Sequence, residues 1–435
     1  GKDLYMNGHV QHYRGFWKQR LPKNLADVKK YGYSLAYQTH QHESRHTEDS
    51  KFLELCSRIG LAVFTGAPTV AAMRERMFAS DENVAQYRRH LDYWAKSCRN
   101  YPAIAGASVC VNMLCAAWWM EGPQDFGQHE VTLEGNKGLN VVALKAVNMA
   151  REYNPSAFYF AHGDGNIGDI GNCNFYFNFI PLQEREEWLS SWAENGKISC
   201  YPAEFGGPYY ACWFAQHLPE PTEWAAVYFG DEAYRREPQR YLEACRAFAK
   251  DCSKRHYGGW VRTNEDKRGE LYQYVPMAWE VNKLFTSRVN RTWRAWGEGP
   301  GMMYLVNWDW TDDDPYLQVQ RMYNGQLIGF LGGQPAFTDK KHAYRAGESV
   351  EKCLVYCWDG FGDKKVSAKW TLKEKATGKV VTSGQQSVML KQSDTLKEPF
   401  SFVAPSVAKR TDYTLSVEFD APGFDPTAKT DSFDL

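Results

Sequence analysis

Apolar strands and amphipathic helices alternate along residues 1–320. Short apolar runs that end in turn residues, such as 33–40 and 198–204, are typical of strands buried on both faces. Segments with a helical period, such as 24–32 and 138–153, lie between such runs. This order predicts parallel strands connected by helices, as in a (β/α)8 TIM barrel.

The period changes to two residues at about position 316. Short alternating runs then follow, separated by turn residues, at 347–356, 366–374, 379–383, 400–403 and 413–419. Their spacing is typical of an immunoglobulin-like β-sandwich. We therefore predict an α/β chain with a barrel at 1–320 and a sandwich at 321–435, where Trp358 and Trp370 are available if the sandwich binds carbohydrate.

One strand end carries a chemical signal. Residues 198–208 run from an apolar strand into Glu204, which a glycine turn follows. The last residue of a barrel strand faces the pocket at the carboxyl-terminal rim. A carboxylate there can attack an anomeric carbon if a second carboxylic acid, about 5 Å away, protonates the leaving oxygen. A glutamate that caps a helix or pairs with an arginine fits the same local sequence, so both interpretations stay open.

Several motifs between residues 3 and 310 resemble, in order, the barrel domain of glycoside hydrolase family 2, the β-galactosidase and β-glucuronidase family. The first is the hairpin at 5–10, whose Asn7-Gly8 pair is a type I′ turn signal. The others are the helix-glycine-strand unit at 52–64 and the segment at 100–104 that opens strand 4. The resemblance implies a retaining exo-glycosidase for β-linked sugars, with Glu204 as nucleophile. It implies a glycoside or oligosaccharide substrate, no cofactor, a secreted or periplasmic location, and further domains before residue 1.

Two pocket positions depart from the family pattern. The family ends strand 4 with Asn-Glu, where the glutamate is the general acid/base, but this chain has Asn112-Met113. On strand 2, His40 matches a family histidine, whereas Tyr37 stands where the family has an arginine. These departures favour, as an alternative, an impaired barrel that binds carbohydrate without hydrolysing it.

A displaced acid could restore catalysis. A general acid needs a carboxyl with a raised pKa, and burial beside aromatic rings raises it. Glu121 follows Trp118-Trp119 in the loop after strand 4, and Asp164 lies at the end of strand 5. We retain both as candidate acids. The alternatives are a solvated loop carboxylate for Glu121 and an aspartate that bonds its own turn for Asp164.

The remaining candidate residues are polar or aromatic side chains at strand ends. Residues 173–180 alternate as a strand, and 303–310 should form strand 8, whose tryptophan makes the pocket floor in relatives. The alternative for each is packing within the barrel. The candidate substrate-binding residues are Tyr37, His40, Asn112, His162, Tyr176, Tyr201, Trp308 and Trp310.

A metal-dependent hydrolase is a minor alternative. The pairs His40-x-His42 and His162-x-Asp164, with Asp309, could gather a metal as in amidohydrolases. Those enzymes carry the paired histidines on strand 1 and use a carboxylated lysine or paired histidines on middle strands. We find no counterpart at matching positions, so the sequence predicts no metal site.

The composition of the chain limits the classes of binding partner that it could have. A net charge of −1 provides no basic field for nucleic acid. No apolar run approaches the roughly 20 residues of a membrane helix. The 11 cysteines form no CxxC pair, so most are interpreted as small buried side chains. Aromatic residues make up 15% of the chain, which suits stacking on sugars, although most should pack in the core.

Overall fold

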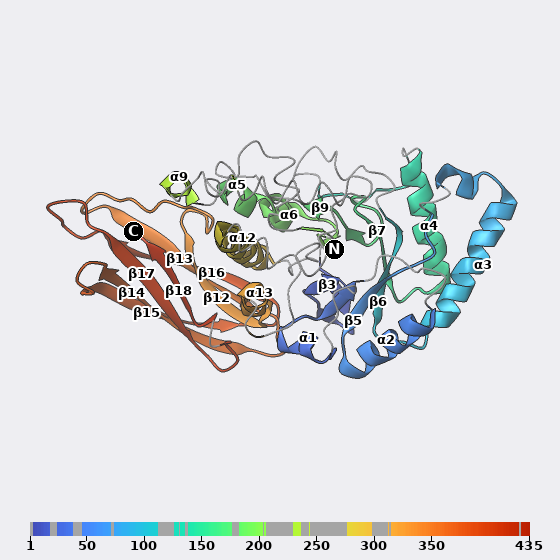
Figure 1. Cartoon of the computed structure of the whole chain (residues 1–435), viewed down its shortest axis with the longest axis horizontal. Coiled ribbons are helices and arrows are strands. Elements are labelled where there is room, and N and C mark those ends of the chain that lie inside the picture. Colours follow the sequence, from blue (N-terminus) through green and yellow to red (C-terminus); the bar gives the residue numbers. More distant parts are fainter. Residues whose placement is uncertain are drawn as a thin grey trace.

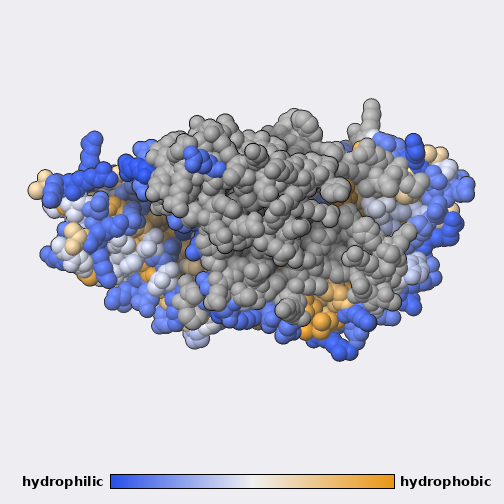
Figure 2. Space-filling view, in the orientation of Figure 1, coloured by the Kyte–Doolittle hydropathy of each residue, from blue (hydrophilic) through white to orange (hydrophobic). Residues whose placement is uncertain are grey.

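The computed structural model describes residues 3–17, 24–37, 46–70, 74–111, 126–129, 131–134, 138–175, 182–202, 204–205, 229–235, 243, 276–297, 312, 315–425 and 428–435. Figure 1 shows an elongated molecule with an α/β region at one end and long antiparallel strands at the other. We call the described residues up to Asn324 the α/β region and those from Leu327 onward the strand-rich region. Polar side chains cover much of the described surface at both ends in Figure 2.

Parallel strands form the centre of the α/β region. Five of them make one sheet in sequence order: β3 (Gly15–Trp17), β4 (Leu35–Tyr37), β5 (Ala62–Gly66), β6 (Ile104–Val111) and β7 (Phe158–His162). Two short parallel pairs join β8 (Ile170–Gly171) to β10 (Ser199–Cys200) and β9 (Asn174–Phe175) to β11 (Glu204–Phe205). The mixed α/β fold is confirmed. The described strands do not close a ring, and 303–310, the predicted strand 8, lies outside them.

Helices lie between these strands, and several end where the sequence indicates. They are α1 (Asp27–Lys30), α2 (His46–Ile59), 3-10 helix η3 (Arg74–Phe78), α3 (Asp81–Cys98), α4 (Leu139–Tyr153), α5 (Leu182–Glu187), α6 (Ser190–Asn195), α9 (Glu232–Arg235), α12 (Pro276–Ala295) and α13 (Pro315–Asn324). Gly60, with φ 66°, follows α2 as predicted. The helix predicted at 24–32 is shorter in the structure, where α1 covers only Asp27–Lys30. Among the described helices, none has the length and apolar character to cross a membrane.

The strand-rich region consists of two antiparallel sheets. Its strands are β12 (Leu327–Gly333), β13 (Ser349–Trp358), β14 (Lys364–Glu374), β15 (Val380–Leu390), β16 (Asp394–Val403), β17 (Tyr413–Asp420) and β18 (Thr430–Asp434). The sheet orders are β12-β13-β16 and β15-β14-β17-β18, and both sheets contribute to one apolar core. Trp358 and Trp370 are buried in that core, so neither is an exposed platform for sugar. The predicted boundary at 320/321 falls within α13 and stays a prediction.

A hairpin packs at the start of the α/β region. Its strands β1 (Tyr5–Met6) and β2 (His9–Val10) are joined by Asn7 and Gly8, with φ of 53° and 83°. Positive φ at both turn residues is the type I′ geometry that the sequence predicts. Leu4 and Tyr13, on either side of the hairpin, are buried against the strands of the parallel sheet. The N-terminal segment is therefore part of the core.

Candidate functional site

Several polar and aromatic side chains lie at the carboxyl ends of the parallel strands. The carboxyl ends of parallel strands meet at one edge of a sheet, where barrel enzymes place their sites. Tyr37 ends β4, His162 ends β7, and Asp164 follows two residues later. Tyr201 follows β10, and the backbone of Glu204 begins β11, paired with Asn174. Tyr37, His162 and Tyr201 are far apart in the sequence, and their side chains lie close together in the fold.

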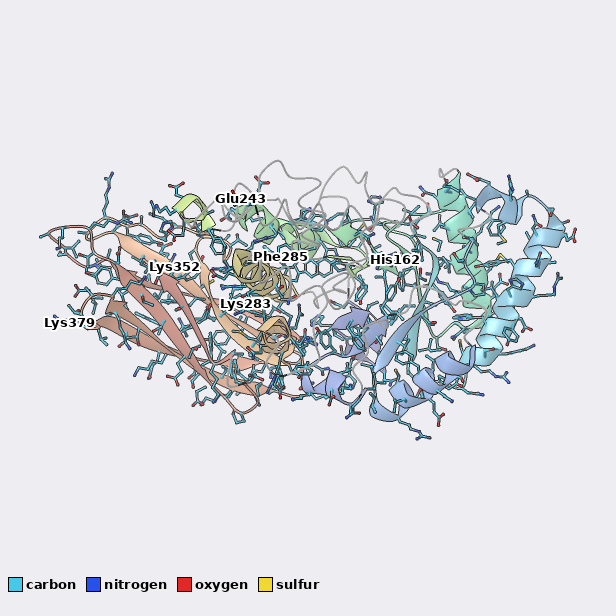
Figure 3. All side chains as sticks on the ribbon, viewed as in Figure 1. His162, Glu243, Lys283, Phe285, Lys352 and Lys379 are labelled. Carbon is cyan, nitrogen blue, oxygen red and sulfur yellow. The ribbon has the colours of Figure 1, made fainter. Side chains whose placement is uncertain are left out.

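Tyr37 and His162 form a buried pair. The Tyr37 hydroxyl lies 2.6 Å from His162 Nδ1, and the ring centroids are 5.4 Å apart with planes inclined by 15°. Both side chains are 0% exposed. The Tyr201 ring centroid lies 6.5 Å from that of Tyr37. Three of the predicted substrate-binding residues are therefore neighbours, and substrate contact stays a prediction. In Figure 3, His162 lies inside the α/β region, far from Lys352 and Lys379.

Aromatic rings surround Tyr37. The rings of Phe160 and Tyr37 stack at 6.0 Å, and Phe64 contacts both Phe160 and Tyr201. All three residues of β4 are buried, so a large uncharged side chain fits its last position. A phenol can bury its ring there and satisfy its hydroxyl with one hydrogen bond. The position that holds an arginine in the family pattern is therefore filled by a phenol that shares a hydrogen bond with His162.

Asp164 is an interior carboxyl. It is 3% exposed, and its Oδ2 lies 3.4 Å from the Cys110 thiol of β6. Burial, and next the charge of Asp164, raise the pKa of Cys110 well above the usual range, so the thiol stays protonated and donates. Cys110 was interpreted only as a small buried side chain. The signal in the sequence is its place near the end of the predicted strand 4, two residues before Asn112.

Asn172 connects the loop after β7 with the segment before Glu204. Its Oδ1 accepts from the Gly163 backbone N–H at 2.9 Å, and its Nδ2 donates to the Tyr201 carbonyl at 2.8 Å. The side chain is fully buried, and sequence reasoning did not single it out. The loop can turn tightly because Gly165 has a φ of 85°, a conformation that glycine adopts freely.

Tyr201 reaches across the interior toward strand β3. A Cβ added at Gly15 would collide with the Tyr201 hydroxyl, so the absence of a side chain at Gly15 makes room for the phenol. The Tyr201 backbone N–H donates to the Gly171 carbonyl at 2.9 Å. Glu204 follows three residues later. The first strand of the sheet therefore contacts the segment that leads into Glu204.

No model of a known protein family matches the sequence, and no curated protein matches it. Among solved structures, it is similar to the β-D-mannosidase of Dictyoglomus thermophilum, with TM-score 0.55 and 11% identity over 98% of this chain and 50% of that one. It is also similar to the exo-chitosanase CsxA of Amycolatopsis orientalis, with TM-score 0.50 and 10% identity over 99% and 49%.

The chain has a glycoside hydrolase family 2-like fold. A variant of the same chitosanase in complex with PNP-β-D-glucosamine gives TM-score 0.51 and 11% identity over 99% of this chain and 49% of that one. The chain thus spans about half the length of these enzymes. Because only 10–11% of the aligned residues are identical, this similarity concerns the fold alone. The predicted resemblance to family 2 is therefore confirmed for the fold.

Six predicted site residues of the family 2-like fold lie outside the described residues: His40, Asn112, Glu121, Tyr176, Trp308 and Trp310. Met113, His42 and Asp309 also lie outside them, and only the backbone of Glu204 lies within them. Among the described side chains, no three of histidine, cysteine, aspartate or glutamate form a group that could hold a metal ion. The roles of these residues stay predictions.

Proposed function

We propose that this chain is the catalytic part of a retaining, exo-acting β-glycosidase with Glu204 as nucleophile. The supporting observation is the family 2-like fold combined with the place of Glu204 at the start of β11, beside β9. Tyr37, His162 and Tyr201 lie together in the interior of the α/β region, and Tyr201 precedes Glu204 by three residues. The proposal includes a closed (β/α)8 barrel and an immunoglobulin-like arrangement of the strand-rich sheets.

The proposed reaction has two displacement steps at the anomeric carbon. The Glu204 carboxylate attacks that carbon while a carboxylic acid protonates the departing glycosidic oxygen. The same acid, now a carboxylate, then takes a proton from the water that breaks the glycosyl-enzyme ester. We propose Glu121 as this acid and Asp164 as the second candidate, since Asp164 is an interior carboxyl after β7.

The proposed substrate is a β-linked glycoside, bound by its non-reducing end. The similar solved structures are those of a β-D-mannosidase and an exo-chitosanase, whose names support a carbohydrate substrate but differ in the sugar. We propose that His40, Tyr37, Asn112, His162, Tyr176 and Tyr201 surround the sugar and that Trp308 or Trp310 forms the stacking floor. Flat aromatic faces suit the apolar faces of pyranose rings.

A barrel that binds carbohydrate without turnover is the second candidate function. Met113 stands where the family pattern has its acid/base, and methionine cannot donate a proton. Retaining chemistry without an acid still cleaves glycosides whose leaving group needs no protonation. The two candidates therefore differ most on leaving groups of high pKa.

A panel of aryl β-glycosides tests the proposal. Hydrolysis of both activated and unactivated members is expected of the complete enzyme, and hydrolysis of activated members alone indicates a missing acid. A matching 2-fluoroglycoside should label Glu204, as located by peptide mass spectrometry, and Glu204→Gln should lose the label and reduce turnover at least about 10³-fold. Labelling elsewhere would exclude Glu204. If sugar binds without turnover, a gain of hydrolysis in Met113→Glu would support the binding candidate.

A further inference from the structure

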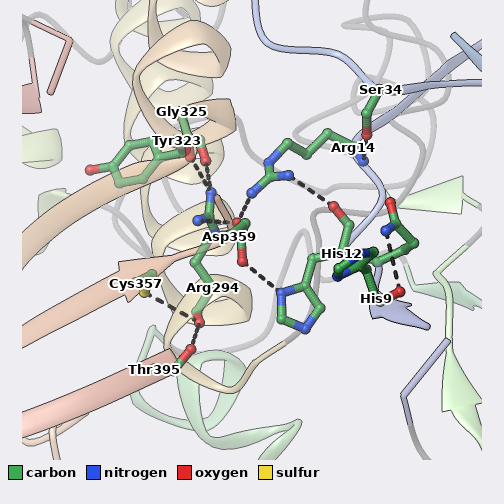
Figure 4. A network of polar contacts seen from close by, with 11 residues as sticks. His9, His12, Arg14, Ser34, Arg294, Tyr323, Gly325, Cys357, Asp359 and Thr395 are labelled. Atoms are coloured by element: carbon green, nitrogen blue, oxygen red, sulfur yellow. Dashed lines mark hydrogen bonds and ion pairs between the residues drawn. The ribbon is translucent and has the colours of Figure 1, made fainter. Parts of the chain in front are cut away.

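A buried ionic cluster joins the strand-rich region to the α/β region (Figure 4). Asp359, after β13, lies 2.7 Å from His12 Nδ1 through its Oδ1. Its Oδ2 lies 2.6 Å from a guanidinium nitrogen of Arg294 in α12 and also pairs with Arg14. The Asp359 side chain is 10% exposed and those of Arg14 and Arg294 are 6% and 2% exposed. One carboxylate from the strand-rich region thus binds three side chains of the α/β region.

Asp359 is a counter-ion of both Arg14 and Arg294 in this cluster. Burial, and then the charges of Arg14 and Arg294, lower the pKa of His12 to about 3, so His12 is neutral and donates to Asp359. Burial first, and Arg294 next, lower the pKa of Arg14. Two buried guanidinium groups therefore share one carboxylate. Removing that carboxylate leaves like charges together without a counter-ion, which is far more costly than losing an exposed ion pair.

The backbone of Arg14 fixes the beginning of β4. Its N–H donates to Ser34 Oγ at 2.9 Å, and its carbonyl accepts from the N–H groups of Ser34 and Leu35 at 3.0 and 3.1 Å. β4 is only three residues long and ends at Tyr37. A displacement of Arg14 therefore moves the strand that presents Tyr37 to His162, with no flexible loop between them.

The residue after Arg14 contacts the other side of the site. Gly15 makes room for the Tyr201 hydroxyl, and Tyr201 precedes Glu204 by three residues. Gly15 also pairs with Leu35 in the parallel sheet. Arg14 is thus linked to the Tyr37–His162 pair through β4 and to the segment before Glu204 through Gly15. Both links consist of hydrogen-bonded or packed neighbours.

We propose that Asp359 is a positioning residue for the candidate site, acting from the strand-rich region through Arg14 on Tyr37 and Tyr201. This inference rests on the proposed function of the site. The strand-rich region then contributes to turnover and not only to stability. A small misplacement of reacting groups can reduce turnover about 10²-fold, so loss of Asp359 should reduce kcat more than it changes KM.

The NMR signals of His162 can report the geometry of the candidate site. The Tyr37 hydroxyl and His162 Nδ1 share a hydrogen bond, and the roles of donor and acceptor depend on the tautomer of the imidazole. The ¹⁵N signals of His162, assigned with His162→Gln, report the state of each ring nitrogen and so the geometry of this contact. They can be measured whether or not the protein hydrolyses a glycoside, so failure of the proposed function leaves this test intact.

The experiment compares Asp359→Asn with two matched variants. Asp363→Asn removes a carboxylate that pairs with Lys391 on the surface, four residues away. Leu354→Ala lowers stability from the core of the strand-rich region without touching Arg14. All are measured below their melting temperatures, for kcat, KM and the ¹⁵N signals of His162. We expect about a 10-fold lower kcat, KM within about two-fold and altered His162 signals in Asp359→Asn alone.

Two outcomes overturn the proposal. One is an unchanged His162 signal in Asp359→Asn, and the other is an equal loss of kcat in Leu354→Ala. If Asp359→Asn does not fold, Arg14→Lys takes its place, because it keeps the charge but loses the guanidinium fork that holds Asp359 and the His12 carbonyl. Wild-type kcat and His162 signals in Arg14→Lys also overturn the proposal, and changes in both support it.

Discussion

Apolar side chains such as Leu354, Val366 and Leu415 meet between the two sheets of the strand-rich region, whereas the α/β region turns Tyr37 and His162 inward. The first interior is held by apolar burial, which is non-directional and tolerates small shifts. The second also contains a directional hydrogen bond between Tyr37 and His162, which lies among packed aromatic rings. The geometry of the Tyr37–His162 pair should therefore respond more to small displacements than the apolar interior of the strand-rich region does.

The largest expected effect concerns the ionic cluster between the two regions. The pKa of His12 is lowered from 6.5 to about 3, so between these values the unfolded chain binds a proton that the folded chain does not. The free energy of unfolding should therefore fall as the pH drops from about 6.5 to about 3, by up to about 5 kcal/mol. Urea titrations across this range measure it. His12→Gln should flatten the dependence, and an equal slope in that variant would assign the effect to other groups.

Next in size is a cavity in the strand-rich interior. Leu354 is fully buried, so Leu354→Ala should lower the free energy of unfolding by about 2–5 kcal/mol while leaving the His162 signals unchanged. Tyr37→Phe, the matched change in the other interior, should cost only about 1–3 kcal/mol but alter the His162 signals. Denaturant titration and NMR measure the pair. The contrast between the regions fails if both variants alter His162.

A smaller effect is expected where Gly15 faces Tyr201. Gly15→Ala places a methyl group where the Tyr201 hydroxyl lies, and such overpacking costs about 1–3 kcal/mol. Tyr201→Phe removes the hydroxyl, so it should restore part of the stability of the alanine variant. A double-mutant cycle from thermal unfolding measures the coupling. Strictly additive effects would mean that the two residues do not compete for the same space.

The smallest effect is expected at exposed ion pairs, whichever region holds them. Glu54 pairs with Arg58 on α2, and Asp363 pairs with Lys391 in the strand-rich region. All four side chains are more than half exposed, so Glu54→Gln and Lys391→Gln should each change the free energy of unfolding by less than about 1 kcal/mol. A larger loss in one variant would show that its pair supports the fold more than exposure suggests.

Local signals account for the parts of the fold that the sequence predicts. Asn7-Gly8 and Gly60 specify their own backbone, so the hairpin and the end of α2 follow from a few residues. The departure at Tyr37 could also be seen in the sequence. Its partner could not, because the contact with His162 depends on the register of strands 125 residues apart.

The same limit applies to Asp359. Its partners His12 and Arg14 are separated from it by 347 and 345 residues, and no periodicity links them. Asn172 was also missed, because its side chain bonds backbone groups of two different segments. A sequence pattern predicts the role of a residue within its own helix, strand or turn. Contacts between elements need the folded chain.

The burial of four cysteine thiols should limit their reaction with oxidants. Cys110, Cys173, Cys353 and Cys357 are all buried, and burial raises the pKa of each, to about 11 for Cys353. The thiolate is the form that reacts with peroxide, disulfides and alkylating agents. These four side chains are therefore protonated and shielded in the folded chain. Native protein should resist iodoacetamide at these positions, and reaction there would report opening of the interior.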